Sequence, residues 1–251
     1  MKKKLFTVLA PLALMVFSPV AFAATKPLAN TTLGNQYPYQ LSYFLELDVD
    51  GNRRSSAMYI GNGYLLTAAH AITDDSGQVP SYRVFGYANG KNLDTRTDHS
   101  DIDSGAADKV FQPMPGYLGK GDMAYDIGLV RLTRPSQRTT ALNTSQVRFG
   151  VYSQLSKLKG KQFTIISNSL NVGGRWAYET GTIAEVRNDG LLRANITAVQ
   201  GQSGSPIIVD GEIVGVATGT LPNGQLIITP LTTEIADNLL RPNGFTSISI
   251  K

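Results

Sequence analysis

Residues 201–206 read GQSGSP and lead directly into a short apolar run at residues 207–209. Ser203 therefore stands between two glycines, and glycine tolerates the unusual backbone torsions of a tight turn. In such a turn the backbone N–H groups of Gly201 and Ser203 would point at one spot and form an oxyanion hole. Taken alone, a serine in a glycine-rich turn is ordinarily only a turn residue. Ser203 becomes a candidate nucleophile only together with the two motifs described next.

Two earlier stretches carry the side chains that a serine nucleophile needs. Residues 65–70 read LLTAAH, an apolar run that ends at His70, one of two histidines in the chain. Residues 125–132 read YDIGLVRL and place Asp126 at the start of an apolar run. A serine needs a base that takes its proton and a carboxylate that orients the imidazole. Taken alone, His70 could be structural and Asp126 a strand-end acid. Asp122 is a weaker carboxylate candidate, because it is not joined to the apolar run.

Most of the remaining chain consists of short apolar or alternating runs separated by turn residues. Pairs such as Asp50-Gly51 and Asn223-Gly224 are typical of hairpins. Many short strands at this spacing predict a β-sandwich or β-barrel rather than alternating strands and helices. The predicted strands are residues 41–49, 57–60, 64–67, 127–132, 163–167, 175–186, 191–197, 207–209, 213–218 and 225–229.

Two further segments complete the organisation. Apolar residues at helical spacing predict one helix over residues 231–240, with Thr232 or Thr233 as its N-cap. The polar stretch at residues 143–161 is a candidate connection between two halves of the chain.

The composition excludes several classes of site. The chain has 251 residues, of which 42% are hydrophobic and 17% charged, with no cysteine and two histidines. This length suffices for one large all-β domain or two ordinary ones. The lack of cysteine excludes disulfides, thiolate metal sites and a cysteine nucleophile. Two histidines nearly rule out a multi-histidine metal site. We therefore expect no metal and no other cofactor.

The first 23 residues have the features of a secretory signal peptide. Lysines at positions 2–4 precede an apolar stretch at residues 5–17, and residues 21–23 read AFA, a small-x-small cleavage site. The apolar stretch is shorter than the about 20 residues of a membrane span, so a retained anchor is the less favoured alternative. Cleavage after Ala23 would remove three lysines and lower the net charge from +4 to +1, so no nucleic-acid partner follows from the charge. We expect a secreted or periplasmic bacterial protein without a membrane partner after cleavage.

Residues 94–108 form an acid-rich stretch that includes the second histidine. Dense oxygen ligands suggest calcium, but the stretch lacks the glycine and the distal glutamate of an EF-hand loop. We expect a solvated loop. The side chains that suggest calcium are Asp94, Asp98, His99, Asp101 and Asp103.

In this order, the three motifs resemble those of the trypsin/chymotrypsin-like serine peptidases. Residues 67–70 (TAAH) are similar to the family's histidine motif, residues 126–132 to its aspartate motif, and residues 201–206 to its serine motif. The resemblance covers roughly residues 36–240. It includes further segments in register at residues 37–42, 111–117, 213–220 and 231–240.

The resemblance implies that His70 is the general base, Asp126 its orienting partner and Ser203 the nucleophile. The implied fold is all-β, with two six-stranded antiparallel β-barrels of the chymotrypsin type and a C-terminal helix. The active site would lie in the cleft between the barrels. Residues 24–142 would form the N-terminal barrel that carries the histidine and aspartate. Residues 143–251 would form the C-terminal barrel that carries the serine, together with the helix.

Two positions depart from the trypsin pattern. Trypsin-like enzymes carry an aspartate before the serine that pairs with the new N-terminus on zymogen cleavage, and Gln202 stands there in this chain. This motif style resembles the bacterial glutamyl endopeptidase and exfoliative-toxin branch. In that branch a histidine on the substrate-binding strand helps hold an acidic side chain, but the matching residue here is Ala217.

The implied specificity pocket carries no charge. An acid is missing from its floor, so a buried lysine or arginine of a substrate would lack a counter-charge. We expect a small or medium uncharged residue next to the cleaved bond. Thr218 would lie beside Asp126, and residues 218–220 would pair with the substrate backbone, unless they form an ordinary barrel strand. Thr220, where the family often has glycine, would narrow the mouth of the specificity pocket. The implied substrate-binding residues are Thr197 and Ala198 at the floor of the pocket, together with Thr218, Gly219 and Thr220.

Two functions of different classes follow. The first is a secreted serine endopeptidase that cleaves peptide bonds of a protein or peptide substrate through an acyl-enzyme. The alternative is a catalytically silent binding or toxin-like module on the same fold, because Gln202 removes the ion pair that orders the oxyanion hole in trypsin. The sequence predicts no oligomeric state.

Overall fold

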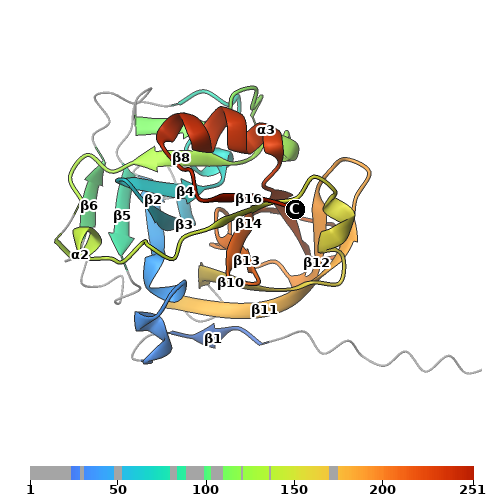
Figure 1. Cartoon of the computed structure of the whole chain (residues 1–251), viewed down its shortest axis with the longest axis horizontal. Helices are drawn as coiled ribbons and strands as arrows, with labels where there is room; N and C mark the ends of the chain where they lie inside the picture. The colour runs from blue at the N-terminus through green and yellow to red at the C-terminus, as the bar shows by residue number, and fades with distance from the viewer. Residues whose placement is uncertain are drawn as a thin grey trace, which may run out of the picture.

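The structure is a computed structural model that describes most of the chain (Figure 1). The predicted signal peptide and the Asp50-Gly51 turn lie outside the described residues, and of the acid-rich stretch only residues 99–102 are described. No helix in the described part is long and apolar enough to cross a membrane. The described residues are 24–28, 31–47, 53–79, 84–88, 99–102, 110–119, 121–135, 137–169 and 175–251.

The first sheet contains seven strands among the described residues, and every neighbouring pair is antiparallel. The hairpin between β3 and β4 turns at Gly61, Asn62 and Gly63, which all have positive φ. Glycine and asparagine adopt this conformation at the lowest cost. In order across the sheet the strands are β6 (His99–Ile102), β5 (Val84–Ala88), β2 (Ser42–Leu47), β3 (Arg53–Gly61), β4 (Tyr64–Thr67), β8 (Gly128–Arg131) and β7 (Phe111–Pro113).

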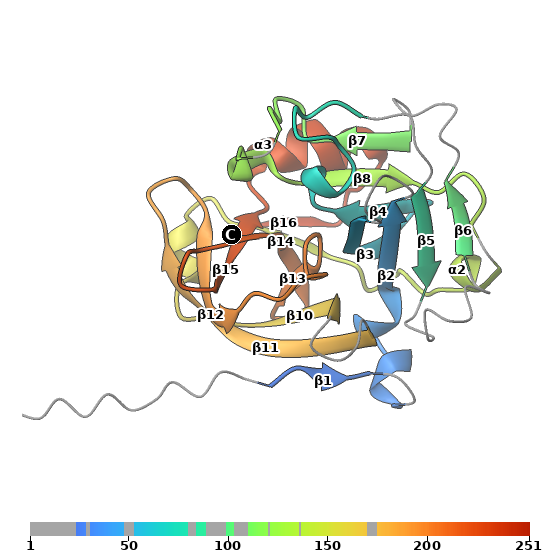
Figure 2. The same cartoon turned by 180° about the vertical axis from the view of Figure 1, so that it is seen from behind.

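Six strands of the second sheet close into a barrel, because the end strand β13 pairs with both β10 and β14. The ring order is β13 (Pro206–Val209), β10 (Gln162–Ser169), β11 (Arg175–Val186), β12 (Leu192–Thr197), β15 (Gln225–Pro230) and β14 (Glu212–Thr220). Three strands lie outside the ring. β1 (Lys26–Pro27) pairs with β11 (Figure 2), while β9 (Phe149–Val151) pairs in parallel with β14 and with β16 (Ile248–Ile250).

Buried apolar side chains fill the barrel and also join it to the first sheet. Phe163, Ile183 and Ile228 belong to the cluster inside the barrel. A larger cluster combines residues of the first sheet, such as Leu66, with barrel residues such as Ile213. Burying one such side chain stabilises the fold by about 1.5–3 kcal/mol. The two sheets therefore share a core, and this shared core fixes how they meet.

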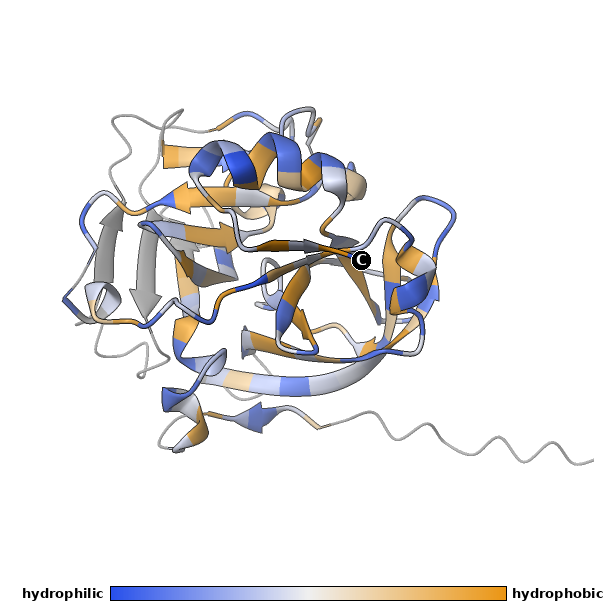
Figure 3. Ribbon diagram, viewed as in Figure 1, coloured by the Kyte–Doolittle hydropathy of each residue, from blue (hydrophilic) through white to orange (hydrophobic). Residues whose placement is uncertain are grey.

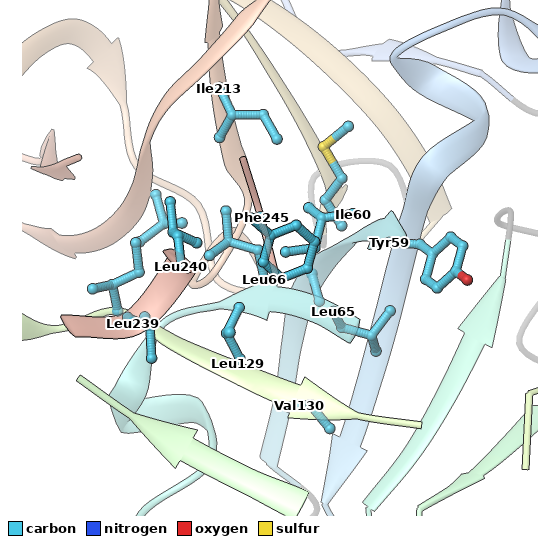
Figure 4. Packing of buried hydrophobic residues seen from close by; sticks show 14 of the residues in the cluster. Tyr59, Ile60, Leu65, Leu66, Leu129, Val130, Ile213, Leu239, Leu240 and Phe245 are labelled. Atoms are coloured by element: carbon cyan, nitrogen blue, oxygen red, sulfur yellow. The ribbon is translucent and has the colours of Figure 1, made fainter. Parts of the chain in front are cut away.

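The predicted C-terminal helix packs on the first sheet. It begins as α3 (Thr233–Ile235) and continues as a π-helical turn (Ala236–Leu240) and a 3₁₀ turn (Arg241–Asn243). The Thr232 hydroxyl accepts the Ile235 N–H, which makes Thr232 the N-cap. Hydrophobic and hydrophilic residues alternate along the helix (Figure 3), and Leu239 and Leu240 lie close to Leu129 (Figure 4). A second, shorter helix is α2 (Gln137–Thr140).

The expected all-β fold with a C-terminal helix is confirmed, and so is one six-stranded barrel. The other sheet has seven strands among the described residues, one more than the six expected, because β6 and β7 are separate strands at its two ends. They follow each other in the chain, and residues 103–109 between them lie outside the described residues. The polar connection at residues 143–161 contains a buried strand, β9. The division at residue 143 stays a prediction.

Candidate active site

Three segments that are far apart in sequence meet beside the shared core. His70 lies in a 3₁₀ turn that directly follows β4, and Asp126 lies between another 3₁₀ turn and β8. β4 and β8 pair antiparallel with Thr67 opposite Gly128, so the end of β4 and the start of β8 are neighbours. This pairing brings His70 and Asp126 together.

The Asp126 carboxylate binds His70 at two points. Its Oδ2 lies 2.6 Å from the imidazole Nδ1, and its Oδ1 accepts the His70 backbone N–H at 2.8 Å. The Thr218 hydroxyl also donates to Oδ2. Asp126 is buried, whereas the His70 side chain is 32% exposed. The carboxylate thus fixes the ring and its Nδ1–H tautomer, because a carboxylate only accepts hydrogen bonds.

Ser203 lies on the same cavity as this pair. The cavity has a volume of about 460 Å³, and His70, Asp126, Ser203 and Thr218 all line it. The turn that carries Ser203 leads into β13 of the barrel, while His70 and Asp126 come from the first sheet. The predicted base, its orienting acid and the predicted nucleophile therefore share one solvent-accessible space.

The turn around Ser203 requires its two glycines. Gly201 and Gly204 have φ of +94° and +78°, a region that favours glycine. A Cβ at Gly201 would collide with the Asn168 carbonyl oxygen, and one at Gly204 with the Thr67 hydroxyl. Within the described residues, the N–H groups of Gly201 and Ser203 donate no hydrogen bond. Both donors remain available for an oxyanion.

Gln202 is a buried, neutral residue, and its hydrogen bonds to Val199 stabilise this turn. Its side-chain Oε1 accepts the Val199 N–H at 2.8 Å, and its backbone N–H donates to the Val199 carbonyl at 3.1 Å. Behind it lies the buried Glu179, whose pKa is raised by burial, an effect that the nearby Thr25 and Gln202 side chains partly offset. A neutral amide thus stands where trypsin-like enzymes carry an ion-paired aspartate.

The expected substrate-binding residues are only partly brought to the cavity. Thr218 lines it. Gly219 lies beside Met123, since a Cβ there would stand 3.1 Å from the Met123 methyl carbon, and Thr220 is exposed at the end of β14. Thr197 and Ala198 lie at the end of β12, where the Ala198 N–H donates to the Gly224 carbonyl at 2.8 Å. These four residues do not line this cavity.

Several cavity residues were not anticipated from the sequence. They include Arg54, Tyr117 and Met123, and they reach the cavity from loops and strand ends. Burial and the nearby Asp126 charge raise the pKa of the Tyr117 phenol, so it stays neutral. Tyr117 stands at the end of the family-like segment 111–117, which was the one available signal. The weaker carboxylate candidate, Asp122, accepts the Leu118 N–H.

No group of three or more histidine, aspartate or glutamate side chains that could hold a metal ion occurs among the described residues. The proton-accepting ring, the buried carboxylate and the hydroxyl are the groups suited to acyl transfer.

A comparison with protein families gives one match. The family described as Trypsin matches residues 30–233, which is most of the chain. The chain belongs to the trypsin family. Members of the trypsin family are serine proteases, and the chain is accordingly a hydrolase of this class.

Solved structures show the same fold at low sequence identity. A Glu endopeptidase in complex with MPD superimposes with a TM-score of 0.68 at 18% identity, covering 87% of this chain and 96% of that one. The protease Anisep from Arthrobacter nicotinovorans gives 0.64 at 14% identity, covering 81% and 95%. A thermostable serine protease, AL20, from an extremophilic microorganism gives 0.63 at 11% identity, covering 82% and 98%. No curated protein sequence matches significantly. At these identities the three structures show a shared fold.

Proposed function

We propose that this trypsin-family protein is a secreted serine endopeptidase that cleaves peptide bonds through an acyl-enzyme on Ser203. The observation that carries the proposal is the His70–Asp126 pair, with its 2.6 Å Nδ1–Oδ2 contact, on the cavity that Ser203 also lines. In the proposed triad His70 is the general base, Asp126 its orienting partner and Ser203 the nucleophile.

The proposed steps follow from the tautomer of His70. With Nδ1–H bound to Asp126, Nε2 of the neutral ring is the proton acceptor. Ser203 Oγ attacks the substrate carbonyl carbon while Nε2 takes the hydroxyl proton, and Asp126 stabilises the imidazolium. The C–N bond then breaks as Nε2 gives this proton to the leaving amine. Water, activated by the same base, hydrolyses the acyl ester. The N–H groups of Gly201 and Ser203 bind the oxyanion in both tetrahedral intermediates.

For the substrate, we propose a small or medium uncharged residue before the cleaved bond. Support comes from the sequence, because the resemblance places Thr197 and Ala198, and no acid, at the pocket floor, although neither residue lines the cavity described above. It also comes from Ala217, which packs in the apolar barrel interior where the glutamyl branch carries a histidine. A peptide library incubated with purified protein tests this preference. Cleavage mainly after lysine, arginine or glutamate would contradict it.

We also propose export followed by cleavage after Ala23. The residues just after this position take part in the fold, since Lys26 and Pro27 pair with β11. N-terminal sequencing of the protein recovered from the periplasm and medium tests the proposal. A mature chain that starts upstream of Ala24, or protein that stays in the cytoplasm, would contradict it.

Covalent labelling separates an active protease from a silent module. A fluorophosphonate reacts with a serine only when a base and an oxyanion hole activate that serine. We expect stoichiometric labelling of Ser203, located by peptide mass spectrometry, and no labelling of Ser203→Ala. A folded wild-type protein that stays unlabelled would favour the silent module, for which the neutral Gln202 is the one supporting observation.

A further inference from the structure

One buried serine outside the proposed triad binds the turn that carries Ser203. Ser56 lies on β3 of the first sheet and is fully buried. Its hydroxyl donates to the Gly201 carbonyl at 2.7 Å, and its backbone N–H donates to the Ser203 carbonyl at 2.7 Å. These two bonds cross from the first sheet to the barrel. They end on the two residues whose N–H groups would form the oxyanion hole.

The Ser56 hydroxyl also accepts a hydrogen bond. The Asn168 N–H of β10 donates to it at 2.9 Å. The single hydroxyl therefore bridges a barrel strand and the turn, with its proton and one lone pair both used. On its other side, the Ser56 carbonyl accepts the Thr67 hydroxyl at 2.8 Å. Thr67 stands three residues before His70, so Ser56 also links the turn to the segment that carries the proposed base.

Gly201 needs an external partner to keep its orientation. At a φ of +94° glycine is unstrained, but it is also free to adopt many other conformations. The Gly201 carbonyl belongs to the peptide plane between Gly201 and Gln202. The Ser56 hydroxyl fixes this plane from a buried strand, because turning it would leave both the carbonyl and the hydroxyl unsatisfied. An unsatisfied buried group costs about 1–3 kcal/mol. This restraint acts on the carbonyl side and leaves the Gly201 N–H free.

We propose that Ser56 is a positioning residue that holds the carbonyls of Gly201 and Ser203. These two bonds fix the peptide planes on either side of the Gln202–Ser203 peptide, which carries the Ser203 N–H, so that the N–H groups of Gly201 and Ser203 converge on the cavity. This role rests on the proposed function, because it matters for catalysis only if the turn stabilises an oxyanion. Ser56 does not line the cavity, so we expect it to make no contact with the substrate. It acts through the turn, and in this chain it supplies a restraint where Gln202 has no ion pair.

The test compares Ser56→Ala with Ser42→Ala. Ser42 is a matched control on the neighbouring strand β2, since it is also buried and its hydroxyl has no partner among the described residues. We expect Ser56→Ala to lower kcat for a peptide ester by about 10–100-fold, less than the loss of an oxyanion donor itself. We expect KM to change by less than about 3-fold, because the restraint acts mainly in the transition state. Ser42→Ala should retain the wild-type kcat.

A second readout does not depend on activity. Amide hydrogen exchange across residues 199–205 should speed up in Ser56→Ala and stay unchanged in Ser42→Ala. Unchanged kcat and unchanged exchange in Ser56→Ala would overturn the proposal, as would a KM increase at constant kcat. If the wild type neither hydrolyses esters nor reacts with a fluorophosphonate, the proposed function fails. The exchange data alone then decide whether Ser56 positions the turn.

A conservative variant covers the case in which Ser56→Ala does not fold. Ser56→Cys keeps a side chain of similar shape, but its thiol is a weaker donor. We expect its kcat to lie between those of Ser56→Ala and the wild type, with faster exchange at residues 199–205. A folded Ser56→Cys protein with wild-type kcat and wild-type exchange would overturn the positioning role.

Discussion

The carboxylate of Asp126 holds both the backbone and the ring of His70. Its Oδ1 accepts the His70 N–H, and its Oδ2 lies 2.6 Å from Nδ1. An asparagine could keep this geometry but would favour the wrong imidazole tautomer, with its proton on Nε2. We therefore expect Asp126→Asn to lower kcat by about 10⁴-fold, as measured with a peptide ester. Asp210→Asn, at an exposed position, is the control. An Asp126→Asn enzyme within tenfold of the wild type would argue against the triad.

Thr218 supplies a third hydrogen bond to the buried Asp126. Thr218→Val keeps the shape of the side chain and removes this donor, so one carboxylate lone pair loses its partner. Hydrogen bonds to charged groups contribute about 1.5–3 kcal/mol, and we expect kcat to fall about tenfold. Thr218→Ser retains the hydroxyl and should stay near the wild-type kcat. Equal kcat values for the valine and serine variants would show that this bond does not support the histidine.

Burial raises the pKa of Glu179 above its value in the unfolded chain, which is about 4.3. Because the folded state binds the Glu179 proton more tightly than the unfolded chain does, this proton adds to the free energy of unfolding. Its contribution is fully present below the unfolded pKa and is lost as pH rises through the folded pKa. The neutral Glu179→Gln side chain removes this dependence. Urea unfolding over a pH series should show the wild type losing stability relative to Glu179→Gln as pH rises from about 4. Glu185→Gln, on a more exposed glutamate, is the control. A stability difference that stays constant with pH would contradict the raised pKa.

Gly204 and Gly211 have nearly the same backbone torsion but different surroundings. Their φ values are +78° and +80°, and a Cβ at Gly204 would collide with Thr67 and Ser56, whereas at Gly211 it would meet nothing within 4 Å. Gly211→Ala should cost about 1–2 kcal/mol from backbone strain alone. Gly204→Ala should cost clearly more, because the collision adds to the strain. Thermal unfolding of both variants measures the difference, and equal losses would show that the turn can move away.

The sequence predicted the order of elements well where the hydrophobic pattern was long or the turn residues were strong. The strand predicted at residues 175–186 has the bounds of β11, and the glycine-rich turn at residues 61–63 stands between β3 and β4. β9 was missed, since its three residues are too few for a periodic signal and follow the polar Arg148. Tertiary packing against β14 and β16, rather than a local pattern, makes it a strand.

For the candidate site, the motifs predicted residues that the structure brings to one cavity, but most of the cavity's other residues carry no signal. His70, Asp126, Ser203 and Thr218 each stand in a recognisable local pattern, and all four line the cavity. Ser56 had no such signal: it is a small polar residue in a strand, and its partner Gly201 is 145 positions away. Tyr117 and Arg54 reach the cavity by loop and strand-end geometry, which composition and spacing do not encode.

The proposed proton acceptor and the proposed nucleophile lie in turns next to strands of different sheets. The shared core and the hydrogen bonds of Ser56 and Thr218 across the two sheets hold them in register. The rate of catalysis would then depend on how tightly the two sheets pack against each other. We expect a mild denaturant concentration that weakens this packing to abolish catalysis while each sheet still retains its strands.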